Sequence, residues 1–397
     1  MLNIAVVGGS IAGCLGALEL ARDGHAVTVF EREHSPLNGA GIGVLPGVLQ
    51  VLLRREWVGE AFPRLDMPYQ AYVTHVAGGE ALGQRAWTPA RPGIALNWSD
   101  LQRSLRACVP DTAYISGVRV SGVQEQSARG VTLSLADGSA RSFDLVLFAD
   151  GYRSQGRALV CPEARLEYRG YTLWRAVVPL PADSAPLEGT VQLVHQRGSP
   201  GYLVAYPIPD GSGRNVPDAR VVNIACYLPL PAAELREFLI DREGRAHAGS
   251  LPPGSMRPEV EARLKREIAG RVPPYFAALV EQARDSFAQP IFTAAVPRYC
   301  SGRIGLLGDA GSLAQPITGS GVLKALENAR GIAARLRKIA DVDEALAAWS
   351  ADATTFGALL VRLGSRMEQQ LVWNMPDLSA RPAAENERWW AELTRVQ

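Results

Sequence analysis

The segment that decides the fold is Ile4-Ala5-Val6-Val7-Gly8-Gly9-Ser10-Ile11-Ala12-Gly13, which a helical stretch separates from Val27-Thr28-Val29-Phe30-Glu31. Its parts are a buried strand, a glycine-rich turn, a helix and a second strand that ends in an acid. This order predicts a nucleotide-binding βαβ unit, in which backbone N–H groups and a helix N-terminus face a pyrophosphate and Glu31 accepts hydrogen bonds from a ribose. Ser10 replaces the middle glycine of the usual G-x-G-x-x-G pattern. A plain βαβ unit with a glycine-rich turn is the alternative.

Length and composition describe a globular chain. The 397 residues are enough for two domains of ordinary size, and 47% of them are hydrophobic while 20% are charged. The formal net charge of +1 gives no reason to expect a nucleic-acid partner. No apolar run reaches the roughly 18–20 residues that a membrane-spanning helix needs. Since no basic segment with a cleavage site precedes the first strand, we also expect no signal peptide.

The cysteines and histidines argue against disulfide and metal chemistry. The cysteines are odd in number, widely separated and without a C-x-x-C pair, which favours a reducing cytoplasm over a disulfide framework. The five histidines form neither an H-x-H nor an H-E-x-x-H arrangement, so we expect no metal site. The cysteines are Cys14, Cys108, Cys161, Cys226 and Cys300.

The middle of the chain differs in character from its two ends. Prolines cluster there, and strand-like runs carry Tyr and Trp. These runs predict a separate antiparallel sheet, and a helical segment over 258–285 follows them. The runs are 171–178, 190–195, 202–206 and 221–227.

We therefore expect an α/β fold in which a discontinuous nucleotide-binding domain surrounds an inserted sheet. Its first part would be 1–165, of which 70–97 contribute to the other domain. The inserted, β-rich substrate domain would be 166–295. The second part of the nucleotide-binding domain and the C-terminal helices would be 296–397.

Two further segments place polar groups at strand ends. The apolar strand 145–149 runs into Asp150-Gly151, with Ser154 and Arg157 close behind; an ordinary turn after a core strand is the alternative there. A second buried strand ends at Gly308-Asp309 and leads into Gln315-Pro316-Ile317-Thr318-Gly319-Ser320-Gly321, which opens a long helix over about 320–339. This last loop offers backbone donors to an electron-rich ligand.

Taken in order, the three segments resemble the flavin-dependent aromatic hydroxylases, the single-component FAD monooxygenases whose archetype is p-hydroxybenzoate hydroxylase. The resemblance covers nearly the whole chain. A narrower one, to the 2,6-dihydroxypyridine 3-hydroxylase branch, includes Trp98, where most of the wider family has an FAD-contacting arginine. Its other carriers are Gly8-Gly9-Ser10, Tyr168–Arg175, Ala205–Pro209, Asp241–Arg245, Ser250–Gly254 and Gly302–Ala310.

The resemblance implies a Rossmann-like FAD-binding domain of the p-hydroxybenzoate hydroxylase type, with an inserted antiparallel sheet and C-terminal helices. It also implies that the first turn cradles the FAD pyrophosphate, that Asp309 binds the ribityl chain, and that the N-terminus of the late helix faces the N1–C2=O edge of the isoalloxazine. A helix N-terminus stabilises the negative charge that a reduced flavin carries there. The implied FAD contacts are Gly8, Ser10, Ile11, Ala12, Gly13, Glu31, Arg32, Gly43, Val44, Gln102, Asp309, Pro316, Gly319, Ser320, Gly321 and Val322.

The activity implied by the resemblance is hydroxylation of an aromatic or N-heteroaromatic ring with NAD(P)H and O2, through a flavin C4a-hydroperoxide. The donor, NADH or NADPH, stays open because no second G-x-G-x-x-G unit is present, and so does a homodimer. The alternatives are an FAD-dependent Baeyer–Villiger, epoxidising or halogenating enzyme, and a non-catalytic flavin-binding protein. The Trp-x-Trp-x-Ile-Pro segment expected of a halogenase does not occur.

Residues of the middle sheet supply the candidates for substrate chemistry. His195 titrates near neutrality and can pass a proton from the substrate, although a surface histidine beside a turn is the alternative. Tyr206 is the second catalytic candidate. Tyr202, Tyr227 and Trp174 are the candidate substrate contacts, with ordinary packing in a strand as the alternative for each.

Overall fold

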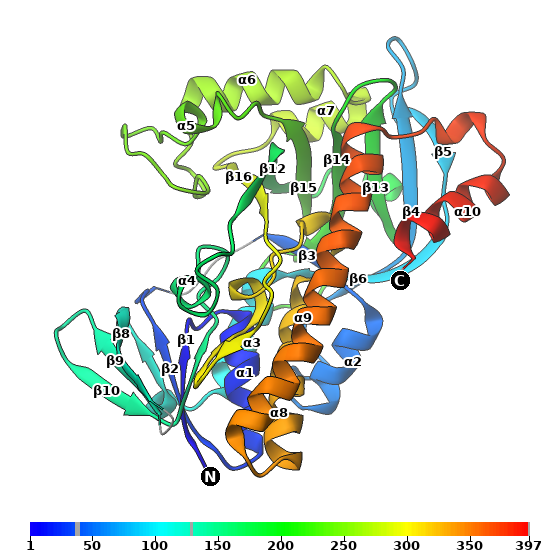
Figure 1. The fold of residues 1–397 in the computed structure, drawn as a ribbon. Coiled ribbons are helices and arrows are strands. Elements are labelled where there is room, and N and C mark those ends of the chain that lie inside the picture. Colours follow the sequence, from blue (N-terminus) through cyan, green and yellow to red (C-terminus); the bar gives the residue numbers. More distant parts are fainter. Residues whose placement is uncertain (36–39, 128–129, 396–397) are drawn as a thin grey trace.

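The computed structural model describes residues 1–35, 40–127 and 130–395, which form two large sheets (Figure 1). The first has six strands in the order β17-β18-β11-β1-β2-β7, and all neighbours are parallel except β17 and β18. This sheet confirms the predicted Rossmann-like α/β class. Its strands are β1 (Asn3–Val7), β2 (Ala26–Glu31), β7 (Tyr114–Ser116), β11 (Leu145–Phe148), β17 (Cys300–Ser301) and β18 (Ile304–Leu306).

Helices bury the apolar strands of this sheet in one core. The side chains of β11 are buried throughout, as expected for a parallel strand covered on both faces. α1 packs on α8 and α3, and α8 packs on α9. The helices of this half are α1 (Ile11–Arg22), α2 (Pro46–Arg54), α3 (Trp98–Cys108), α4 (Gln155–Val160) and α8 (Gly321–Lys338).

The second sheet has nine strands in the order β16-β12-β15-β14-β13-β4-β6-β3, with β5 paired to β4. Its pairs are antiparallel except β13 and β4, which run parallel. The four runs predicted to form this sheet pair antiparallel with one another, and the one parallel junction joins β13 to β4, a strand from a distant stretch of the chain. The strands are β3 (Gly41–Val44), β4 (Leu65–His75), β5 (Gln84–Trp87), β6 (Ala90–Asn97), β12 (Glu167–Pro179), β13 (Thr190–Gln196), β14 (Tyr202–Pro209), β15 (Arg220–Pro229) and β16 (Phe287–Thr293).

The two faces of this sheet have different neighbours. Helices α6 (Pro258–Ala269) and α7 (Pro274–Glu281) lie along one side of it in Figure 1, and α5 (Leu235–Phe238) precedes them. Trp174 and Ala176 belong to the apolar cluster that includes residues of these helices. Because side chains alternate along a strand, Leu173 and Arg175 point to the other face.

The remaining elements connect the two halves. α9 (Val342–Met367, orange in Figure 1) runs from beside α8 up to the second sheet, where it continues as a π-helix over Glu368–Trp373 and leads to α10 (Ala383–Thr394). A three-stranded sheet consists of β8 (Val120–Ser127), β9 (Gly130–Leu135) and β10 (Ala140–Phe143), and Asp137-Gly138 lie in the turn between β9 and β10.

The side chain of Asn97 caps α3 by accepting a hydrogen bond from the Ser99 N–H. Within the described ranges, no helix combines the length and apolar character needed to cross a bilayer.

Candidate active site

A cavity of about 1410 Å³ lies between the two sheets. Its wall combines the turn after β1, the start of α8 and one face of the nine-stranded sheet. Single-ligand pockets have volumes of roughly 300–1,000 Å³, so this one has room for a large cofactor together with a small substrate.

The turn after β1 is built for close backbone approach. Gly8 has a φ of +104°, and a Cβ placed on it would lie 2.5 Å from the Ala149 carbonyl oxygen. A Cβ on Gly13 would lie 1.8 Å from the Gly8 oxygen, so neither position accepts a side chain without moving backbone. Ser10 stands at the N-cap of α1 and lines the cavity, with no capping hydrogen bond from its side chain. The N-terminus of α1 therefore faces the cavity, as anion binding requires.

The carboxylate of Glu31 stabilises this turn through hydrogen bonds. Its Oε2 accepts a hydrogen bond from the Gly9 N–H at 2.7 Å and its Oε1 accepts one from the Glu33 N–H at 2.9 Å. The carboxylate is buried and lines the cavity. The carboxylate at the end of β2 therefore both stabilises the turn and faces the cavity.

The resemblance implies sixteen FAD contacts, and two of these residues, Gln102 and Gly13, do not line the cavity. Gln102 instead donates from Nε2 to the Gly9 oxygen at 3.3 Å, and Tyr114 donates to the same oxygen at 3.1 Å. Gly13 lies beneath the turn, against Gly8. Gln102 and Gly13 support the backbone of the turn, and their direct contact with FAD stays a prediction. The other fourteen predicted positions line the cavity.

The second and third segments meet the first. Arg157 donates from Nη1 to the carbonyl oxygens of Asp309 at 2.9 Å and Ala310 at 3.2 Å. A Cβ on Gly308 would lie 2.8 Å from that of Ala12. Asp150 lines the cavity and accepts from the Gln155 N–H at 2.7 Å, while burial raises the pKa of its carboxyl. Three stretches far apart in sequence therefore form one wall.

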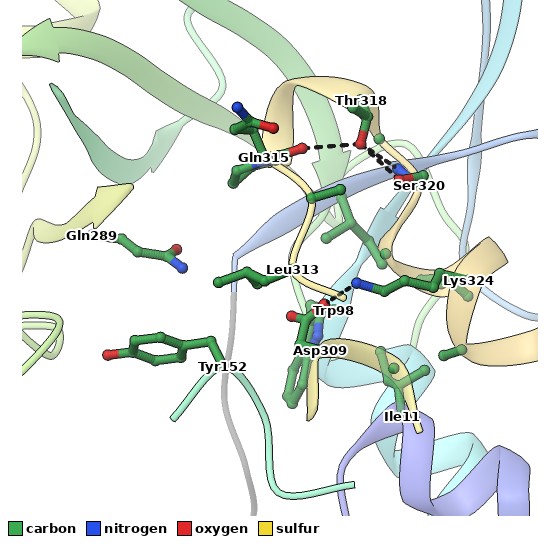
Figure 2. A pocket seen from close by; sticks show the side chains of 18 of the residues that line it. Ile11, Trp98, Tyr152, Gln289, Asp309, Leu313, Gln315, Thr318, Ser320 and Lys324 are labelled. Atoms are coloured by element: carbon green, nitrogen blue, oxygen red, sulfur yellow. Dashed lines mark hydrogen bonds and ion pairs between the residues drawn. The ribbon is translucent and has the colours of Figure 1, made fainter. Parts of the chain in front are cut away.

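The loop before α8 presents its backbone to the cavity. Thr318 Oγ1 donates to the Gln315 oxygen at 2.9 Å and lies 2.7 Å from Ser320 Oγ (Figure 2). Gly319 has a φ of +62°, a left-handed conformation that favours glycine. The turn leaves Gly319, Ser320, Gly321 and Val322 along the cavity wall at the N-terminus of α8.

Where the nine-stranded sheet forms the cavity wall, the guanidinium of Arg175 lies among tyrosine side chains. Tyr202 and Tyr227 stack with ring centroids 4.5 Å apart, and Tyr206 lies on the same wall. Arg175 donates to Gly41 and, at 3.3 Å, to Asn223 Oδ1. Burial lowers the pKa of Arg175 and raises that of Tyr206, although the nearby guanidinium partly offsets the latter.

Two predicted site residues lie elsewhere. Trp174 is fully buried under the helix-covered face, where its Nε1 donates to Ser286 Oγ at 3.0 Å. His195 is also buried rather than at the surface, does not line the cavity, and has its pKa lowered to about 4, mainly by desolvation. A contact with substrate is wrong for Trp174, and proton transfer in the cavity is wrong for His195, because the fold directs both away from it.

Three further residues are prominent in the wall, of which Trp98 stands where most of the wider family has an FAD-contacting arginine. Trp98 and Arg175 line the cavity, and Lys324 reaches Asp309 from the first turn of α8. Arg175 follows Trp174 directly and faces the opposite side of the sheet, because side chains alternate along a strand. Lys324 could have been noticed because the chain has only three lysines.

Known proteins are similar to this chain in sequence and in fold. A family model described as FAD binding domain-like matches residues 168–293. The 2,6-dihydroxypyridine 3-monooxygenase of Paenarthrobacter nicotinovorans is 27% identical over 354 residues, which cover 87% of this chain and 86% of that protein. The solved 2,6-dihydroxypyridine-3-hydroxylase from Arthrobacter nicotinovorans has a TM-score of 0.84 at 26% identity, with 95% of each chain covered. Over nearly its whole length the chain is similar to flavin-dependent monooxygenases of the aromatic hydroxylase family.

The fold of this family extends to Klebsiella pneumoniae HpxO, solved with FAD and uric acid, which has a TM-score of 0.73 at 24% identity and covers 99% of this chain and 92% of its own. The p-hydroxybenzoate hydroxylase-like fold expected from the sequence is thereby confirmed. The chain's own residues fit FAD: glycines that tolerate no Cβ approach the cavity, and two helix N-termini open onto it.

Proposed function

We propose that this flavin monooxygenase uses NADH or NADPH and O2 to hydroxylate an electron-rich aromatic or N-heteroaromatic ring. The observation that carries the proposal is the single cavity that joins the dinucleotide turn, the start of α8 and the Arg175–Tyr206 wall. The names of two relatives, a dihydroxypyridine monooxygenase and a protein solved with uric acid, favour a nitrogen heterocycle.

In this proposal the cofactor lies along the wall made by the three segments. Ser10 and the N-terminus of α1 hold the pyrophosphate, Glu31 the adenosine ribose, and Asp309 the ribityl chain. The N-terminus of α8 faces the isoalloxazine. Bound FAD supplies hydride acceptance and the activation of O2, which no side chain of the protein provides.

The nine-stranded sheet is the proposed substrate domain. It is built by strands within 166–295 together with β3, β4, β5 and β6, a set that begins at Gly41, well before the segment 70–97. Tyr202 and Tyr227 offer a flat aromatic surface against which a ring can stack. The apolar side chains around them, such as Leu173 and Leu193, limit the access of water to the reacting atoms.

Arg175 is the proposed anchor for a negatively charged ring oxygen. Within the described residues no carboxylate forms an ion pair with it, and the titratable groups that influence it are the phenols of Tyr206 and Tyr227. A half-buried cation without an anionic partner favours an anionic ligand. An aromatic alcohol bound as its anion is more electron-rich, so the same contact positions the ring and activates it toward oxygen transfer.

The experiment is a stepwise assay of the purified protein. We expect a yellow protein with bound FAD, NAD(P)H consumption that a hydroxypyridine or phenol stimulates, and one atom of ¹⁸O₂ in the hydroxylated product. An ester or lactone product would favour the Baeyer–Villiger alternative. Bound FAD without substrate-stimulated NAD(P)H oxidation by any ring of the panel would overturn the catalytic proposal, and a protein that takes up no FAD would overturn the cofactor assignment.

A further inference from the structure

Lys324 occupies an unfavourable position for a cation. It lies in the first turn of α8, where the helix dipole is positive, and its side chain is only 2% exposed. A buried ammonium is costly unless charged and hydrogen-bonding partners compensate. The position therefore calls for a compensating ligand or partner.

The partners of Lys324 come from the third cofactor segment. Nζ donates to Asp309 Oδ1 at 2.6 Å and to the Ser312 carbonyl oxygen at 2.6 Å (Figure 2). The Asp309 side chain is 49% exposed along the cavity wall, whereas that of Lys324 is not. The ammonium thus holds one carboxylate oxygen from the protein side and leaves the rest of the carboxylate open to the cavity.

The surrounding charges balance only when Lys324 is counted. Asp150 and Asp309 contribute two negative charges, and both act on Arg157, which is bound to the Asp309 carbonyl oxygen. Lys324 supplies the second positive charge. Without it this part of the wall has a net charge of −1, in a site proposed to bind a cofactor with two phosphates.

We propose that Lys324 is a positioning residue for FAD, which fixes the Asp309 carboxylate for the ribityl chain and supplies the positive charge that favours the reduced, anionic flavin. The inference rests on the proposed function, since it requires FAD in this cavity. It assigns to a buried lysine a role in cofactor affinity and redox potential that the sequence motif does not contain.

The test replaces Lys324 by Met, which keeps an unbranched side chain of similar length without the charge. The apoprotein is titrated with FAD by flavin fluorescence, and the midpoint potential of the loaded protein is measured with a reference dye. We expect FAD to bind about tenfold or more weakly. We also expect the potential to fall by about 30 mV, which for a two-electron couple equals a tenfold loss of preference for the reduced form.

Three matched variants identify the cause. Lys324→Arg should restore most of the potential, because it keeps the charge. Lys324→Met should add little to the loss of FAD affinity in an Asp309→Asn background, because the pair is already broken, but it should still lower the potential, because the positive charge is lost. Lys338→Met, at the exposed end of the same helix, should change neither readout.

The outcomes separate the two proposals. If wild-type protein binds no FAD, the proposed function fails. If wild-type protein binds FAD while Lys324→Met retains the wild-type affinity and potential, the role of Lys324 is refuted and the proposed function stands. If Lys324→Met fails to fold, Lys324→Gln is measured in the same way, and circular dichroism of each apoprotein identifies the variants whose affinity is comparable.

Discussion

Replacing Arg175 by Met tests the substrate side of the proposal most directly. Met keeps apolar bulk beside Phe287, over which the guanidinium now lies at 5.5 Å, but removes the charge. A hydrogen bond to a charged group contributes roughly 1.5–3 kcal/mol, which equals a loss of about 10- to 150-fold in kcat/KM for a substrate that binds as an anion. A ring without an ionisable hydroxyl should lose much less.

The dependence of kcat on pH provides a second test of the proposed role of Arg175. If Arg175 stabilises the ionised hydroxyl of the bound ring, the acidic limb of kcat against pH should move up in the variant by roughly one to two units, at 1.36 kcal/mol per unit. Tyr206 does not produce this limb, because burial raises its pKa and keeps the phenol neutral in the assay range. Arg197→Met, which removes a half-exposed arginine paired with Asp377 at 3.2 Å, is the control. Unchanged kcat/KM for the anionic substrate together with an unmoved limb would refute the assignment.

Three further predictions concern the scaffold. Gly13→Ala should abolish FAD uptake, measured by flavin fluorescence, because the new Cβ would lie 1.8 Å from the Gly8 oxygen, and retained affinity would contradict the tight turn. Trp174→Phe should cost about 1 kcal/mol in urea unfolding through the lost bond to Ser286, with unchanged KM, whereas a raised KM would return Trp174 to the substrate wall. The folded-state pKa of His195, about 4, lies below its unfolded value of about 6.5, so its contribution to stability is complete above pH 6.5 and is lost as the pH falls toward 4. His195→Gln should flatten that part of the stability profile by up to about 3 kcal/mol, and an identical slope would show that another group titrates.

The cofactor side was predictable from sequence because its chemistry lies in continuous segments. A glycine that needs a positive φ or a close approach leaves a local signature, and an acid at a strand end follows its strand in the chain. Gly8, Glu31 and Asp309 were found in this way, and all three line one cavity. What the motif could not reveal was that the Gln102 side chain donates to the turn itself, because that contact depends on how α3 packs against the first segment.

The substrate side was less predictable because it depends on the register of strands. Trp174 and Arg175 are adjacent in sequence and face opposite sides of the sheet, so an error of one residue exchanges a substrate contact for a core residue. His195 shows the same limit, since nothing local revealed that it lies buried outside the cavity wall. Lys324 was overlooked because its partner Asp309 lies 15 positions earlier and is brought to it only by the packing of α8 on the loop after β18.

Lys324 and Arg175, two cations of the cavity wall, differ in one respect that bears on selectivity. Lys324 is paired with the Asp309 carboxylate, so its own charge is neutralised before any ligand enters. Among the described residues, the hydrogen-bond acceptors of Arg175 are the neutral oxygens of Gly41 and Asn223, so its positive charge is not neutralised. The free energy gained by neutralising that charge is available only to a ligand that brings a negative one. Ionisable hydroxyaromatic rings should therefore bind ahead of neutral rings of the same shape, and their advantage should disappear in the Arg175→Met variant while FAD affinity is retained.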